Sequence, residues 1–237
     1  MKRELPLTAR PQAMPTRTAP TLQPVPVWDW LVRLGHLLLA GGVLLAFASG
    51  ESERWRLWHV LAGSTAGVYV LVRLLWGFCG TRPARFASFI RGPQAVIAYL
   101  QSLLQLHPEQ HTGHNPAGGW AILGLLGLTL LTTASGAFTY WEGFGWLPPA
   151  QADRLLDACG ELHEGLAATL ISLVLVHVAG VVIGSLCHGE NLVRAMLTGT
   201  KLGRPQEQRE HRGLLGVLLL LLLLAGVLTL IWLDAQG

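Results

Sequence analysis

Five long stretches of this chain are almost wholly apolar, and the polar residues are gathered between them. The apolar stretches are Trp30–Ser49, Trp58–Gly80, Gly119–Tyr140, Leu162–Cys187 and Leu214–Leu233. An α-helix needs about 20 apolar residues to cross the hydrocarbon core of a bilayer. The pattern therefore predicts an all-α integral membrane protein with five transmembrane helices. The second and fourth stretches contain titratable residues, so we expect these helices to face protein or a bound group rather than lipid.

The composition agrees with this class of protein. The chain of 237 residues is 51% hydrophobic and only 13% charged, whereas soluble domains average about 25% charged residues. The net charge of +3 is too small to indicate a nucleic-acid partner, and none is expected. The three cysteines, Cys79, Cys159 and Cys187, have neither CxxC nor CxxCH spacing. The sequence therefore gives no support to a zinc site or to covalent c-type haem attachment.

The basic residues predict the orientation in the membrane. Twelve of the seventeen Lys and Arg residues lie in the N-terminal tail, in the 81–118 connection and in the 188–213 connection. The positive-inside rule places these segments in the cytoplasm, and the C-terminus on the opposite side. The 139–161 loop agrees, because it carries four acidic residues and one arginine. Residues 1–27 have six prolines, four basic residues and no apolar signal-peptide core. They are predicted to be a disordered cytoplasmic tail, with the start at Met1 or Met14 left open.

Four histidines lie within the apolar stretches, where ionisable side chains are costly and usually functional. They are His36, His59, His163 and His177. His163 and His177 are fourteen residues apart, so a single helix would hold them about 21 Å apart and within about 40° of the same face. The predicted topology places His36 and His177 toward the cytoplasm, and His59 and His163 toward the outer face. Because a b-type haem takes an axial donor on each face, the pairs predict two haem b groups stacked across the membrane.

Three arginines accompany these histidines. Arg73 follows His59 by fourteen residues on the same predicted face, near the cytoplasmic end of its helix. We expect it to balance the charge of a haem propionate. Arg33 and Arg56 each precede a histidine by three residues and could also contact propionates, although arginines at helix ends often reach toward the interface instead. No catalytic residue is expected.

The other histidines are predicted to be polar surface residues. His107, His111 and His114 lie in one polar cytoplasmic loop, and we favour exposure to solvent over a metal-binding or quinone-related role. His188 and His211 are interpreted as interface and surface residues. Eight tryptophans lie near predicted helix ends, as in the aromatic belt of membrane proteins: Trp28, Trp30, Trp55, Trp58, Trp120, Trp141, Trp146 and Trp232.

An ordered set of short motifs resembles the bacterial cytochrome b561 family and the related b-type cytochrome subunits of membrane-bound nickel–iron hydrogenases. The resemblance covers roughly residues 28–202, and a fifth helix and a proline-rich tail lie outside it. The motifs are Arg56-Leu-Trp-His59-Val-Leu-Ala-Gly63, Arg73-Leu-Leu-Trp-Gly77, Gly113-His114-Asn115-Pro116, Leu162-His163-Glu164, His177-Val-Ala-Gly180-Val and His188-Gly-Glu190-Asn191-Leu-Val-Arg194-Ala-Met196-Leu-Thr-Gly199.

The resemblance implies a four-helix transmembrane bundle that binds two haems, plus one additional C-terminal transmembrane helix. The ligands would be His36 and His177 for the cytoplasmic-side haem, and His59 and His163 for the outer-side haem. We expect a disordered tail at 1–27, a cytochrome b561-like di-haem domain at 28–202, a polar linker at 203–213 and the fifth helix at 214–233. That helix would be a lipid anchor or a partner-binding element.

The resemblance also implies respiratory electron transfer across the bacterial inner membrane. Electrons would pass between the quinone pool and a redox protein, such as a c-type cytochrome or a hydrogenase or dehydrogenase subunit. Whether the protein has quinone oxidoreductase activity of its own stays open, as does a homodimer. One alternative is a haem-bearing membrane-anchor subunit of a hydrogenase- or dehydrogenase-type complex. A second alternative is a haem-free transporter whose histidines relay protons.

Overall fold

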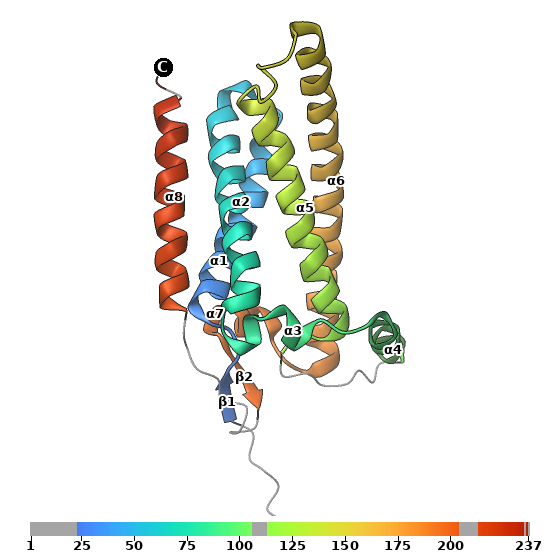
Figure 1. The fold of residues 1–237 in the computed structure, drawn as a ribbon. Helices are drawn as coiled ribbons and strands as arrows, with labels where there is room; N and C mark the ends of the chain where they lie inside the picture. The colour runs from blue at the N-terminus through green and yellow to red at the C-terminus, as the bar shows by residue number, and fades with distance from the viewer. Residues whose placement is uncertain (1–22, 106–112, 204–212, 235, 237) are drawn as a thin grey trace, which may run out of the picture.

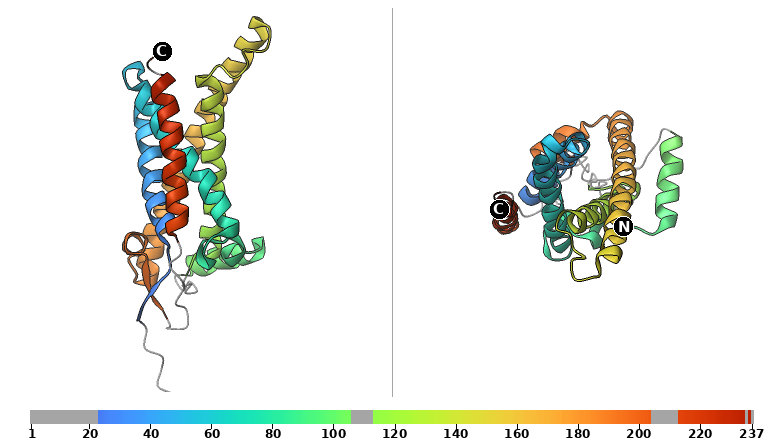
Figure 2. Two further views of the ribbon diagram at one scale, coloured as in Figure 1. Left: turned by 60° about the vertical axis from the view of Figure 1, so that its left-hand side comes forward. Right: turned by 90° about the horizontal axis from the view of Figure 1, so that it is seen from above.

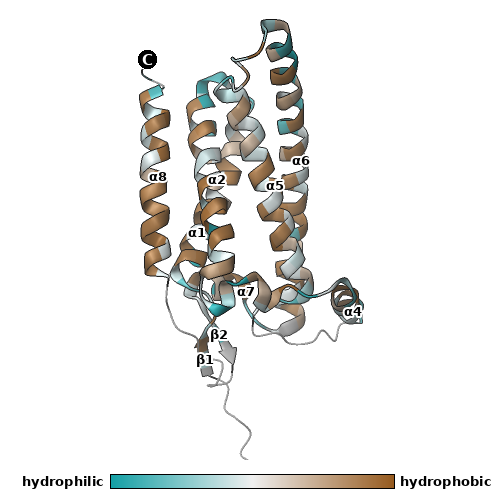
Figure 3. Ribbon diagram, viewed as in Figure 1, coloured by the Kyte–Doolittle hydropathy of each residue, from teal (hydrophilic) through white to brown (hydrophobic). Residues whose placement is uncertain are grey.

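The computed structural model describes residues 23–105, 113–203, 213–234 and 236 (Figure 1). Within these residues, all five predicted spans are helices long and apolar enough to cross a membrane, which confirms an all-α membrane protein. Apolar residues predominate along the helices, and polar residues gather toward the ends (Figure 3). The five helices are α1 (Trp30–Ser49), α2 (Arg56–Cys79), α5 (Pro116–Tyr140), α6 (Pro149–His188) and α8 (Leu214–Asp234).

Helix α6 is much longer than its apolar stretch. It has 40 residues, about 60 Å at 1.5 Å per residue, whereas the hydrocarbon core is only about 30 Å thick. The prediction of a loop over 139–161 is therefore wrong for most of that segment, and Figure 1 shows the extra turns rising past the end of α5. Apolar side chains mark where a helix lies in lipid, but they do not mark where it begins. Pro149 near its start and the Ala and Leu residues that follow favour helix in water as well.

The four helices α1, α2, α5 and α6 form the bundle. Helix α1 packs along α2 and α5 packs along α6, and the two pairs are joined by contacts between α2 and α5. Gly67 permits this close approach, because a Cβ there would lie 2.4 Å from Cγ2 of Thr133. Small residues at helix contacts are the usual means of packing membrane helices closely. The bundle therefore consists of two antiparallel hairpins that meet through α2.

The fifth helix packs against one side of this bundle. Figure 2 shows α8 beside α1 and α2, on the side away from α6. Its residues Leu220 and Leu224 are buried against Leu31, Tyr69 and Val72. The described contacts of α8 thus give it a structural role, in addition to the two roles that the sequence left open.

A layer of short elements, called the cap from here on, covers the end of the bundle that we predict to be cytoplasmic. It contains 3-10 helix η2 (Arg82–Ala84), α3 (Phe86–Phe89), α4 (Pro93–Leu104) and α7 (Leu192–Thr198). Strands β1 (Gln23–Pro26) and β2 (Thr200–Gly203) also lie there, and the 3-10 helix η1 (Glu53–Trp55) lies at the opposite end. Helix α4 is at the same level but lies to the side of the bundle, where it runs across the bundle axis (Figure 2).

The tail predicted to be disordered includes an ordered strand. Residues Gln23–Pro26 pair antiparallel with Thr200–Gly203, with Val25 opposite Lys201. Val25 is completely buried, which explains why this part of the tail is held against the cap. Residues 1–22 and 204–212, which include most of the predicted linker, lie outside the described residues.

Asp29 ties the start of α1 to the end of α2. Its carboxylate is 3% exposed and caps α1 by accepting a 2.9 Å hydrogen bond from the Val32 amide. It also accepts hydrogen bonds from Trp76 Nε1 at 2.9 Å and Thr81 Oγ1 at 2.6 Å. Every oxygen of this buried anion therefore has a donor, as burial of a charge requires.

Replacing Asp29 by alanine should lower the free energy of unfolding by about 2–4 kcal/mol, because it removes a helix cap and leaves two buried donors unpaired. Unfolding in detergent, followed by circular dichroism, measures the effect. Asp29→Asn keeps the cap acceptor and should lose less. Asp153 lies on an exposed turn of α6, so Asp153→Ala is the matched control. Equal stability of the Asp29→Ala and Asp153→Ala proteins would contradict the prediction.

Candidate functional site

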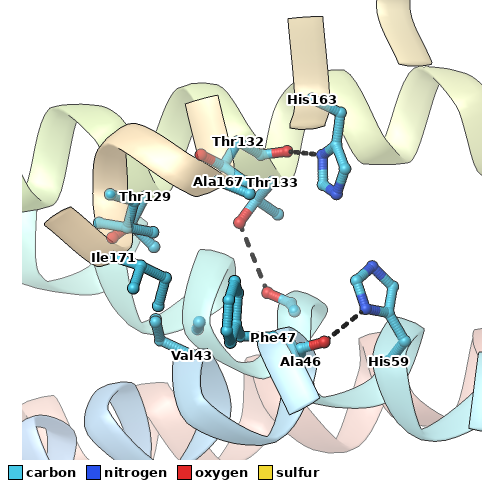
Figure 4. Close-up of a pocket in the computed structure, with 13 residues that line it drawn as sticks. Val43, Ala46, Phe47, His59, Thr129, Thr132, Thr133, His163, Ala167 and Ile171 are labelled. Atoms are coloured by element: carbon cyan, nitrogen blue, oxygen red, sulfur yellow. Dashed lines mark hydrogen bonds between the residues drawn. The ribbon is translucent and has the colours of Figure 1, made fainter. Parts of the chain in front are cut away.

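The outer pair of predicted ligands meets inside the bundle. His59 lies on α2 and His163 on α6, and their rings face each other with centroids 5.8 Å apart and planes at 76°. His163 lies at the start of the predicted stretch Leu162–Cys187 but well inside the helix, because α6 begins fourteen residues before it, at Pro149. The two imidazoles still lie at the same level, as Figure 4 shows. The structure therefore brings together two histidines that are 104 residues apart in the sequence.

Both outer imidazoles are held through the same ring nitrogen. Nδ1 of His59 lies 2.8 Å from the Ala46 carbonyl oxygen, and Nδ1 of His163 lies 2.8 Å from the Thr132 carbonyl oxygen. Because a carbonyl only accepts, Nδ1 carries the proton in the neutral form of each ring, and Nε2 then keeps its lone pair. The free nitrogens point toward one another in Figure 4. Backbone carbonyls of this kind orient histidines that bind metals.

The residues around the outer pair are mostly apolar, and several of them are small. A cavity beside the two rings is lined by residues of α1, α2, α5 and α6, among them Val43, Gly63, Thr129 and Ile171. Gly136 lies directly behind His163, because a Cβ there would lie 2.8 Å from Cε1 of the ring. Sequence reasoning missed Gly136 and both anchoring carbonyls, since a backbone oxygen has no sequence signal.

The inner pair comes from helices α1 and α6. His36 and His177 are each half-buried, and the two imidazoles are close enough to interact electrostatically. Gly35, next to His36, accommodates the Tyr69 ring, which occupies the space that a Cβ would need. The pair thus lies on the same two hairpins as the outer pair, fourteen residues further along α6.

The three predicted arginine contacts lie in different surroundings. Arg73 is 4% exposed, and its Nη1 has no hydrogen-bond partner among the described residues. Arg33 donates through Nη2 to the Leu197 carbonyl, while its buried Nε has no described partner. Arg56 is exposed and pairs with Glu53 at 3.8 Å. Unpaired buried donors at Arg33 and Arg73 suit an anionic ligand, whereas Arg56 is accounted for by its surface ion pair.

One histidine that was predicted to be exposed is not. His114 is half-buried, with its ring 4.4 Å from that of Trp28 and 4.5 Å from that of Phe89 between centroids. Trp28 is itself 7% exposed, so it is packed inside the protein rather than in an interfacial belt. The polar sequence around His114 misled the prediction because the burying residues come from distant segments. His107, His111, His211 and the side chain of His188 lie outside the described residues.

Haem b needs two neutral nitrogen donors and a counter-charge for its propionates. Paired imidazoles with free Nε2 atoms, an apolar cavity and buried arginine nitrogens without a described hydrogen-bond partner fit this group. A membrane helix bundle with these features has the form of a b-type membrane cytochrome. The chain belongs to the prokaryotic cytochrome b561 family, whose model matches residues 27–199. The family implies a four-helix haem bundle, haem b and electron transfer.

Two curated proteins with the same description are similar to this chain. The chain is 26% identical over 219 residues to a probable Ni/Fe-hydrogenase B-type cytochrome subunit of Rhizobium leguminosarum bv. viciae, which covers 78% of this chain and 88% of the relative. It is also 26% identical over 167 residues to the protein of the same description in Bradyrhizobium diazoefficiens, covering 60% of this chain and 64% of the relative. No solved structure matches the chain.

Proposed function

We propose that this protein is a di-haem b-type cytochrome that carries electrons across the bacterial inner membrane between the quinone pool and a redox protein. The main support is the outer pair, in which His59 and His163 face each other with both Nδ1 atoms hydrogen-bonded to carbonyls. A proton relay needs hydrogen-bonding groups that continue from the free Nε2 atoms, whereas the cavity beside the two rings is mostly apolar. Two fixed Nε2 donors on opposite sides of one space are what an axially ligated haem requires.

A second haem site is proposed at His36 and His177. It lies about 21 Å further along α6, as fourteen helical residues require. The unpaired buried nitrogens of Arg33 and Arg73 would bind its propionates. Bound haem supplies the one-electron chemistry, while the chain sets the ligands, the burial and the nearby charge. Two such sites at two depths provide a path across the bilayer.

The domain boundaries and the orientation are part of this proposal. The di-haem domain would extend over 28–202, with the N-terminus cytoplasmic and the C-terminus periplasmic. The distribution of Lys and Arg supports this orientation. The ordered β1 strand and the contacts of α8 suggest that both flanking segments stabilise the domain.

The hydrogenase-related names of the two relatives favour one class of redox partner. We propose that a hydrogenase-type or dehydrogenase-type complex exchanges electrons with one haem, with this protein as its membrane anchor. After solubilisation in mild detergent, a large soluble enzyme should then co-purify with this chain. A b-type cytochrome that instead exchanges electrons with a diffusing c-type cytochrome would purify without such a partner.

The purified protein is expected to show a reduced-minus-oxidised spectrum of b-type haem, with two haems per chain by pyridine haemochrome assay, and to be reduced by a quinol analogue. Copper and zinc content, measured on the same sample, is the control for other metals. A chain folded by circular dichroism but without haem absorbance would overturn the proposed function. One haem per chain would restrict the proposal to a single site.

A further inference from the structure

The cap at the predicted cytoplasmic end holds an imidazole whose packing is evident but whose polar atom Nδ1 is unused among the described residues. The Nδ1 atom of His114 is inaccessible to solvent and has no hydrogen-bond partner among the described residues. The ring lies between Trp28 and Phe89, so its position is fixed by packing. A buried polar atom without a partner is costly and rare in native proteins. This atom is therefore expected to meet a group that belongs to the functional protein.

The charges around His114 indicate what that group is. Arg73, Lys201 and His177 all lie within electrostatic range of the ring. Lys201 is paired with Glu190 at 3.4 Å, and the Asp29 carboxylate already accepts from Val32, Trp76 and Thr81. Arg73 has no such partner for Nη1. Asp29 lies within electrostatic range of Arg73, but its hydrogen bonds go to other donors. The surroundings of His114 thus contain a buried guanidinium with one nitrogen that has no described hydrogen-bond partner.

His114 is neutral in these surroundings. Burial, followed by the positive charge of Arg73, lowers the pKa of His114 from 6.5 to about 3. A neutral imidazole carries one N–H and can donate a hydrogen bond without adding another positive charge to the cap. An N–H donor within electrostatic range of a guanidinium that has an unpaired nitrogen is suited to bind a carboxylate.

We propose that His114 is a haem-contacting residue, whose Nδ1–H binds, together with Arg73, a propionate carboxylate of the haem held by His36 and His177. The inference rests on the proposed function. It assigns a role to a histidine that the sequence placed in a solvated loop. It also accounts for two buried nitrogens that otherwise have no partner, one on Arg73 and one on His114.

The test compares variants of the full-length, haem-loaded protein. His114→Phe keeps a flat ring between Trp28 and Phe89 but removes the donor, and His114→Asn keeps an N–H near the Nδ1 position. The inner haem is identified as the spectral component that is lost in His177→Ala. Its transfer to excess apomyoglobin should become about ten- to hundredfold faster in His114→Phe. The midpoint potential of that component should fall, because an unpaired propionate stabilises the ferric state. His114→Asn should stay close to wild type in both measurements.

Double variants show whether both residues hold the same carboxylate. Once Arg73→Gln is present, adding His114→Phe should change haem loss by a different factor than it does alone, since groups that share a partner are not additive. Arg91 is exposed, and among the described residues its side chain donates to nearby carbonyls, so Arg91→Gln is the control. If His114→Phe does not accumulate, His114→Leu replaces it.

The outcomes separate the two proposals. If the wild-type protein contains no haem component that depends on His177, the proposed function fails at the inner site. If that component is present but His114→Phe loses haem no faster than Arg91→Gln, with an unchanged midpoint potential, only the role of His114 is overturned.

Discussion

Replacing His163 by alanine is expected to remove the outer haem and to leave the inner haem in place, so that the haem-to-protein ratio falls from two to one. The physical reason is that His163 is one of two imidazoles held with free Nε2 atoms on opposite sides of one space. Alanine supplies no donor, and the residues that line the cavity beside the rings include no His or Cys apart from His59 and His163. The pyridine haemochrome assay and the reduced-minus-oxidised spectrum measure the ratio and identify the component that is lost.

The other three histidines should sort into the same two groups. His59→Ala should remove the same spectral component as His163→Ala, whereas His36→Ala and His177→Ala should both remove the other one. His107→Ala is a control, because the sequence predicts a solvated loop there. Loss of one shared component on replacing His36 or His59 would overturn the pairing. A haem spectrum that stays unchanged in all four variants would show that other residues bind the haem, and absence of haem absorbance from the wild type would favour a haem-free protein.

Replacing Gly136 by alanine is expected to have nearly as large an effect without touching a ligand. The new Cβ would lie 2.8 Å from Cε1 and 3.0 Å from Nδ1 of His163, which is closer than van der Waals contact allows. The ring cannot move away without breaking its 2.8 Å hydrogen bond to the Thr132 carbonyl. Overpacking of this kind costs about 1–3 kcal/mol, so the outer haem should be lost about five- to hundredfold faster.

Gly127 offers a matched control on the same helix. A Cβ at Gly127 would have no atom within 4 Å, and alanine is a better helix former than glycine. Gly127→Ala should therefore keep both haems and unfold no more easily than wild type. Apomyoglobin transfer measures haem loss in both variants. Equal rates in the two would show that the His163 ring is not held where the structure places it.

The sequence alone predicted some features of the haem sites and missed others. The histidine pairs were predicted because depth in the membrane follows from helix order and charge, and because fourteen residues bring a helix back to nearly the same face. The structure does place His59 opposite His163, and their role as ligands stays a prediction. His114 was misjudged, because the rings of Trp28 and Phe89 that enclose it come from segments far from it in the sequence.

Hydrophobic length and charge distribution by themselves determined the five spans, the predicted orientation and the candidate ligands. These properties are local, since a helix must satisfy its own backbone in lipid and needs about 20 apolar residues to do so. Only the tertiary structure decided which carbonyls hold the imidazoles and which buried donors lack a partner. Those features depend on backbone atoms and on contacts between distant segments, and neither is encoded in the pattern of side chains along the chain.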